Sequence, residues 1–121
     1  INSVHELHVT SLVYNRSLGF LADIEPDKKK RNALLETVIN KLQEEKEFFK
    51  NREVINSRFS YMLSFNFHQL AKTEIETEKK RNLLLQAKFH AEEQISFSLE
   101  MHPFYFVYLS NNYSHPVPQR Q

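Results

Sequence analysis

The fold is decided by residues 27–102, which read DKKKRNALLETVINKLQEEKEFFKNREVINSRFSYMLSFNFHQLAKTEIETEKKRNLLLQAKFHAEEQISFSLEMH and contain neither glycine nor proline. The chain of 121 residues has a single glycine, Gly19, where average usage would supply about eight. Tight turns and β-hairpins favour residues that tolerate positive φ, and glycine is the usual one. Because such a chain turns rarely, the sequence predicts a few long helices rather than many short strands.

Hydrophobic periodicity places these helices along the chain. We expect four of them, approximately at residues 4–18, 26–50, 53–72 and 74–100, with the first one breaking near Gly19. In the second helix the apolar residues recur mostly at three- and four-residue steps, as one face of a helix requires: Leu34, Leu35, Val38, Ile39, Leu42 and Phe49. The sequence therefore predicts an all-α bundle of about four helices.

Local signals suggest where two of the helices begin. Pro26 suits the first turn of a helix, because the backbone N–H groups of that turn have no partner within the helix, so a proline there loses no hydrogen bond. Thr73 and Glu76 have the spacing of a capping box, which predicts the start of the fourth helix. We expect that helix to bury one apolar face, made of Ile75, Leu84, Ala87, Ala91 and Ile95.

One segment is ambiguous between helix and strand. In residues 59–68 aromatic and aliphatic residues alternate with polar ones, which is typical of a strand. The same segment also has a helical apolar face of Phe59, Met62, Leu63, Phe67 and Leu70, and a helical polar face of Ser57, Ser60, Ser64, His68 and Lys72. We favour the helix because no turn residue separates the segment from its neighbours. The alternative is an α+β fold with strands at 58–68 and 95–109.

The chain is long enough for one domain with its own core. We expect a single helical domain over residues 1–109, in which the aromatic segment Phe104–Leu109 either closes the core or forms an exposed docking strip. Residues 110–121 are polar and include Pro116 and Pro118, so we expect a flexible tail.

The composition excludes several kinds of binding site and several classes of protein. With a formal net charge of +1, the protein has no strong overall electrostatic field that would attract it to nucleic acid or anionic membranes. The absence of cysteine excludes disulfides and thiolate metal sites, and it is compatible with a cytoplasmic location. The longest apolar stretch is far short of the roughly 20 residues of a membrane-spanning helix.

No catalytic motif is evident. His5 and His8 lie three residues apart but lack an obvious third metal ligand, so we interpret them as surface histidines. His90 shares a helical face with Glu93 alone, which we interpret as structural. We therefore expect no metal, no cofactor and no enzymatic activity.

The aromatic residues are the first candidate for function. Ten phenylalanines and five tyrosines exceed what one small core commonly holds. We expect a regulatory interaction module that binds a protein partner, or itself as a homodimer, through rings that supply much of the binding energy at interfaces. The candidate residues are Phe104, Tyr105, Phe106, Tyr108, Phe65 and Phe67. The alternative is a small-molecule sensor whose surplus rings line an apolar pocket.

Two basic clusters are the second candidate: Lys28, Lys29, Lys30 and Arg31, and then Lys79, Lys80 and Arg81. If the second and fourth helices pack in parallel, both clusters meet at one end and form a patch for phosphates or an acidic partner. The neighbouring Asp27, Glu76 and Glu78 neutralise part of this charge, so nucleic-acid binding is the less favoured function.

Overall fold

The computed structural model describes residues 3–101, and within this range it contains four α-helices and no strand. Their bounds are α1 Ser3–Ile24, α2 Lys28–Phe48, α3 Glu53–Lys72 and α4 Thr77–Met101. The all-α bundle is thereby confirmed. The alternative strand at 58–68 is wrong, as is the part of the strand 95–109 that lies within α4. Residues 102–109 and the predicted tail 110–121 lie outside the described residues.

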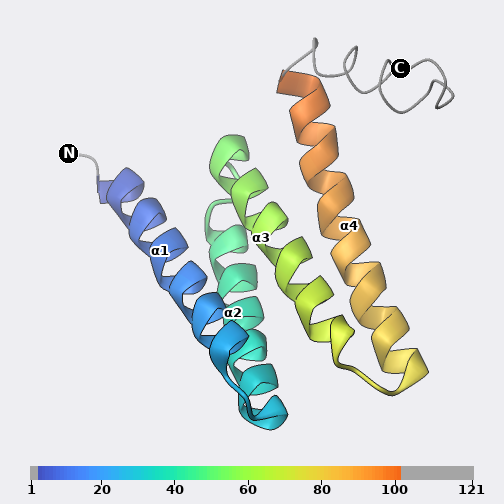
Figure 1. Ribbon diagram of the computed structural model, residues 1–121. Helices are drawn as coiled ribbons and strands as arrows, with labels where there is room; N and C mark the ends of the chain where they lie inside the picture. Colours follow the sequence, from blue (N-terminus) through green and yellow to red (C-terminus); the bar gives the residue numbers. More distant parts are fainter. Residues whose placement is uncertain (1–2, 102–121) are drawn as a thin grey trace, which may run out of the picture.

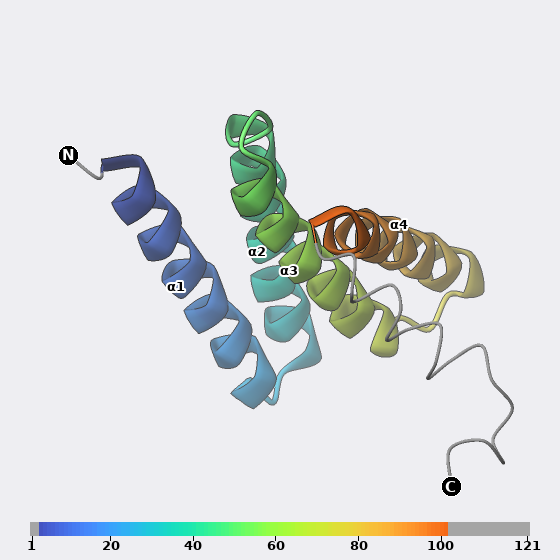
Figure 2. The same ribbon diagram turned by 90° about the horizontal axis from the view of Figure 1, so that it is seen from above.

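Successive helices run in opposite directions, and each packs mainly against its neighbours in the chain. The two views agree that α1 and α4 lie on opposite sides of the α2–α3 pair (Figures 1 and 2). Short connections of a few residues impose this antiparallel order. As a result α1 and α3 point in the same direction, and side chains of both helices line the space between them.

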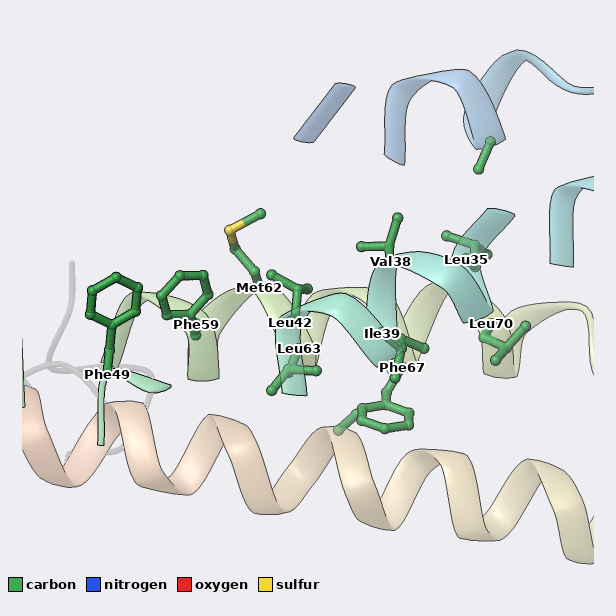
Figure 3. Packing of buried hydrophobic residues seen from close by; sticks show 12 residues of the cluster. Leu35, Val38, Ile39, Leu42, Phe49, Phe59, Met62, Leu63, Phe67 and Leu70 are labelled. Atoms are coloured by element: carbon green, nitrogen blue, oxygen red, sulfur yellow. The ribbon is translucent and has the colours of Figure 1, made fainter. Parts of the chain in front are cut away.

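The core lies between α2 and α3, with contributions from the helices on either side. Figure 3 shows Phe49 beside Phe59, Leu42 above Leu63, and the ring of Phe67 directed towards α4. The rings of Phe49 and Phe59 are stacked with centroids 5.7 Å apart. The buried apolar residues are Ala22, Leu35, Val38, Ile39, Leu42, Phe49, Phe59, Met62, Leu63, Phe67, Leu70, Ala71 and Ala87.

The helix ends differ from the sequence prediction at three places. Helix α1 continues through Gly19 to Ile24, and Gly19 has no positive φ, so it does not break the helix. Helix α2 begins after Pro26, because the Asp27 carboxylate accepts a hydrogen bond from the Lys30 amide and caps the first turn. Thr73 ends α3 rather than beginning α4.

The interface between α3 and α4 corrects two predicted faces. The serines assigned to the polar face of α3 are turned towards α4: Ser60 is buried, and Ser64 Oγ donates to the Ala87 carbonyl at 2.7 Å. On α4 Ala87 is buried as predicted, whereas Leu84 and Ile95 are exposed. Small side chains let two helices approach closely, so packing distance rather than hydropathy determines which face of α4 is covered.

Candidate functional surface

Exposed apolar side chains gather around Tyr61 over α1, α3 and α4, in an area that we call the Tyr61 surface. Tyr61 lines three adjoining hollows: one between α1 and α3, one where these helices approach α4, and one between α3 and α4. The exposed apolar residues around it are Val13, Phe20, Phe65, Leu84 and Ile95. Phe20, Tyr61 and Phe65 are 63%, 58% and 52% exposed, so most of each ring faces solvent.

The helical period explains why α3 contributes to both core and surface. Phe59, Leu63 and Phe67 recur at four-residue steps and are buried, while Tyr61 and Phe65 recur at the same step on another side and are exposed. Two interleaved helical stripes thus produce the alternation that resembles a strand. The i, i+4 spacing of Tyr61 and Phe65 is the sequence signal that distinguishes the exposed pair.

Helix α1 buries polar as well as apolar side chains: Ala22 is fully buried, and Leu12 and Leu18 pack against the core. The buried side chains on its contact with the rest of the domain include His8, Ser11 and Asn15, at 2%, 7% and 1% exposure. In the same helix Phe20 and Ile24 are largely exposed. Asn15 Nδ2 donates to the Ser11 carbonyl at 2.9 Å, so part of the buried polarity is compensated within α1, whereas the exposed apolar groups retain unfavourable hydration. This pattern is typical of a helix whose apolar side meets another molecule.

The predicted aromatic residues fall into three groups. Phe65 belongs to the Tyr61 surface. Phe67 is buried, and its ring stacks on His90 with centroids 5.8 Å apart and planes inclined by 5°, so it belongs to the core. Phe104, Tyr105, Phe106 and Tyr108 lie outside the described residues.

The two basic clusters begin α2 and α4, which start at the same end of the molecule (Figure 1). Arg31 has a structural role. Its guanidinium donates to the Gln69 carbonyl at 3.2 Å and to Thr73 Oγ1 at 3.1 Å, and so provides a hydrogen-bond donor for a carbonyl in the last turn of α3. Lys79 lies 3.9 Å from Glu76. The other members, Lys28, Lys29, Lys30, Lys80 and Arg81, are exposed.

A cluster of polar side chains joins α2, α3 and α4. Glu93 Oε1 lies 3.0 Å from His90 Nδ1, 3.5 Å from Lys46 Nζ and 3.3 Å from Ser60 Oγ. Burial lowers the pKa of His90, against the smaller opposing effect of the Glu93 carboxylate. The imidazole is therefore neutral at pH 7, and since a carboxylate only accepts, Nδ1 carries the proton. Ser60 Oγ contacts Glu93, so the cluster links α2, α3 and α4 through their side chains.

His8 is in the core rather than on the surface, which corrects the interpretation of the His5–His8 pair. Its ring lies edge-on to those of Phe49 and Phe59, with both centroid distances 6.0 Å. Within residues 3–101 no group of three or more histidine or acidic side chains could hold a metal ion.

Comparison with known proteins adds no relationship: neither a family model, nor a curated protein, nor a solved structure matches this chain significantly. Among the described helices, none is long and apolar enough to cross a membrane.

Proposed function

We propose that this protein is a non-enzymatic interaction module that binds a helical segment of a protein partner through the Tyr61 surface. The observation that carries the proposal is the clustering of Phe20, Tyr61 and Phe65, each more than half exposed, around one groove. Large aromatic side chains beside a groove supply most of the binding energy in helix-in-groove complexes.

The exposed apolar residues of helix α1 support the same function. Its packing against α2 leaves Val13 and Phe20 in solvent beside the aromatic rings of α3. A docked helix would cover these residues, and at about 25 cal/mol per Å² of buried apolar area it would recover the hydration cost of the unbound state.

The shape of the surface favours a helix over a small molecule. Two adjoining hollows, with volumes of about 220 and 330 Å³, follow the space between α1 and α3. Both are partly open to solvent rather than enclosed, whereas a ligand sensor buries most of its ligand. An elongated open groove fits the apolar side of an amphipathic helix.

The test is a titration of the protein with a designed amphipathic helix of about 14 residues, neutral on its polar side, followed by NMR chemical shifts. We expect shift changes over the Tyr61 surface and their loss in the double variant Tyr61→Ser, Phe65→Ser. The matched control is Phe48→Ser with Phe89→Ser, since these rings are 69% and 54% exposed but do not line the groove.

Three outcomes decide the proposal. Binding that is lost only in the Tyr61 and Phe65 variant supports it. Absence of binding, or equal loss in the control variant, contradicts it. Sedimentation of the free protein tests the predicted homodimer: a dimer that separates in the same variant would make a second copy, rather than a foreign helix, the partner at this surface.

A further inference from the structure

The groove between α1 and α3 has a basic end. Arg16 of α1 and Arg58 of α3 line the same hollow, together with the apolar side chains of Leu12, Val13 and Met62. No acidic side chain is among its lining residues. Over residues 3–101 neither arginine forms an ion pair or a side-chain hydrogen bond. Two arginines from different helices therefore line one largely apolar hollow, and no ion-pair partner for either lies within residues 3–101.

Such a pair recognises carboxylates well. A guanidinium presents a planar fork of donors that matches the two oxygens of a carboxylate. Because the two arginines repel each other in the free protein, an anion between them relieves this repulsion on binding. The basic end therefore favours an acidic group on the bound molecule.

The rest of the groove determines how long the occupant is. Along α3 its lining extends from Arg58 through Tyr61 and Phe65 to Gln69. The eleven steps from Arg58 to Gln69, at 1.5 Å per step, amount to about 16 Å, or three helical turns. At the far end Asp23 of α1 lines the groove, so the groove has a positive end and a negative end.

The direction of the occupant follows from this polarity. A helix has partial positive charge at its N-terminus and partial negative charge at its C-terminus. Its C-terminal turn is therefore favoured beside Arg16 and Arg58, and its N-terminal turn beside Asp23. Since α1 and α3 run from the basic end towards the acidic end, the bound helix runs antiparallel to both.

Charge also argues against the chain's own C-terminal segment as the occupant. Residues 102–121 contain no aspartate or glutamate and include Arg120. A second copy facing this groove would offer Asp23 as the only acidic residue among the described side chains that line its own groove. A foreign helix with several acidic side chains in its last turn complements the two arginines better.

We propose that the groove between α1 and α3 binds an amphipathic partner helix with acidic residues in its C-terminal turn, which Arg16 and Arg58 anchor in an orientation antiparallel to α1 and α3. This inference rests on the proposed function and adds the charge and the direction of the partner.

The test uses four fluorescent peptides of about 14 residues with one common apolar face. Three carry Glu, Gln or Lys in the last turn, and the fourth carries the same Glu residues in the first turn. By anisotropy we expect the C-terminal Glu peptide to bind about tenfold or more tightly than the Lys peptide, with the Gln and N-terminal Glu peptides between them. A spin label at the peptide's C-terminus is expected to broaden amide signals around Arg16 and Arg58.

Charge reversal provides the matched comparison. The double variant Arg16→Glu, Arg58→Glu is expected to reverse the order, so that the Lys peptide binds most tightly. The control Lys29→Glu, Lys80→Glu changes the net charge equally, at exposed residues outside the groove, and is expected to keep the original order. Circular dichroism verifies that all variants remain helical.

The outcomes separate this inference from the proposed function. Equal affinity of all four peptides, still dependent on Tyr61 and Phe65, would overturn the inference and leave the proposed function standing. If no peptide binds, the proposed function fails as well. Two further results would overturn the acidic helix as occupant: a dimer of the free protein that separates on reversal of Arg16 and Arg58, or tighter arginine-dependent binding to anionic lipid vesicles.

Discussion

Replacement of Gly19 by alanine is the most informative single change, because sequence and structure lead to opposite expectations. A glycine that ends a helix near residue 19 would make Gly19→Ala neutral or destabilising. In the structure Gly19 lies inside α1, and no glycine among the described residues has a positive φ. A Cβ at this position would meet only Asn66 Oδ1, at 3.9 Å, which is an ordinary van der Waals contact.

The magnitude follows from helix propensity. Glycine inside a helix is less favourable than alanine by about 0.5–1 kcal/mol, because it loses more backbone freedom on folding. Since no clash offsets this gain, we expect Gly19→Ala to raise the free energy of unfolding by that amount. For a domain of this size the midpoint of thermal unfolding should rise by about 2–4 °C.

The same position also tests the groove, because Gly19 lines it between Arg16 and Phe20. Gly19→Leu keeps a good helix former in α1 but extends a side chain into the groove. We expect its helicity to match that of Gly19→Ala, while its affinity for the neutral amphipathic peptide falls about tenfold or more.

Thermal unfolding by circular dichroism and peptide anisotropy measure both effects. A lower midpoint for Gly19→Ala would show either that α1 is not continuous through residue 19 or that a Cβ at this position has no room beside Asn66. Unchanged peptide affinity in Gly19→Leu would show that the groove is not the binding site.

Three further predictions concern the fold. Phe59→Ala should lower the free energy of unfolding by about 3–5 kcal/mol, because Phe59 is fully buried and stacked on Phe49 and its loss leaves a cavity; denaturant titration measures this. Arg31→Met should cost about 1–2 kcal/mol, because it removes the hydrogen bonds that close α3, and the same titration applies. Stability should fall as the pH drops from about 7.5 towards 5.5, because burial lowers the pKa of His90 and the unfolded chain therefore takes up the proton first; denaturant titration across this pH range measures the decline.

Each of these predictions has a control at an exposed residue of the same or similar chemistry: Phe48 for Phe59, Lys30 for Arg31 and His68 for His90. Phe48→Ala and Lys30→Met should each change the free energy of unfolding by less than about 0.5 kcal/mol. In His90→Gln the decline with pH should be reduced, whereas in His68→Gln it should persist. A cost at Phe48 equal to that at Phe59, or at Lys30 equal to that at Arg31, would contradict the assigned packing. An unchanged pH profile in His90→Gln would show that another group causes the decline.

Much of the fold was predictable from local patterns. The scarcity of glycine and the stripe from Leu35 to Leu42 were enough to predict helices, and four of them form within residues 3–101. Helix ends were less predictable: Pro26 and Thr73 carry signals that fit a helix start, yet both lie outside the helices that they were expected to begin. Such signals act through one or two hydrogen bonds, and packing easily moves the end by a turn.

The candidate site was predictable only in part. Phe65 was named from its residue type and is exposed, but Phe67, named for the same reason, is in the core. Arg16 and Arg58 carry no local signal at all, because they are far apart in sequence and meet only where α1 and α3 line one groove.

The sequence by itself determined that this protein is helical, since helix formation depends on residues within one or two turns of each other. Only the tertiary structure decided which side of each helix is covered. Ala87 is buried and Leu84 exposed because α3 and α4 approach through small side chains, and His8 is buried while Phe20 is exposed because of the way α1 lies on α2. Burial depends on what packs against a face, and that is a relation between distant segments that no single stretch of sequence contains.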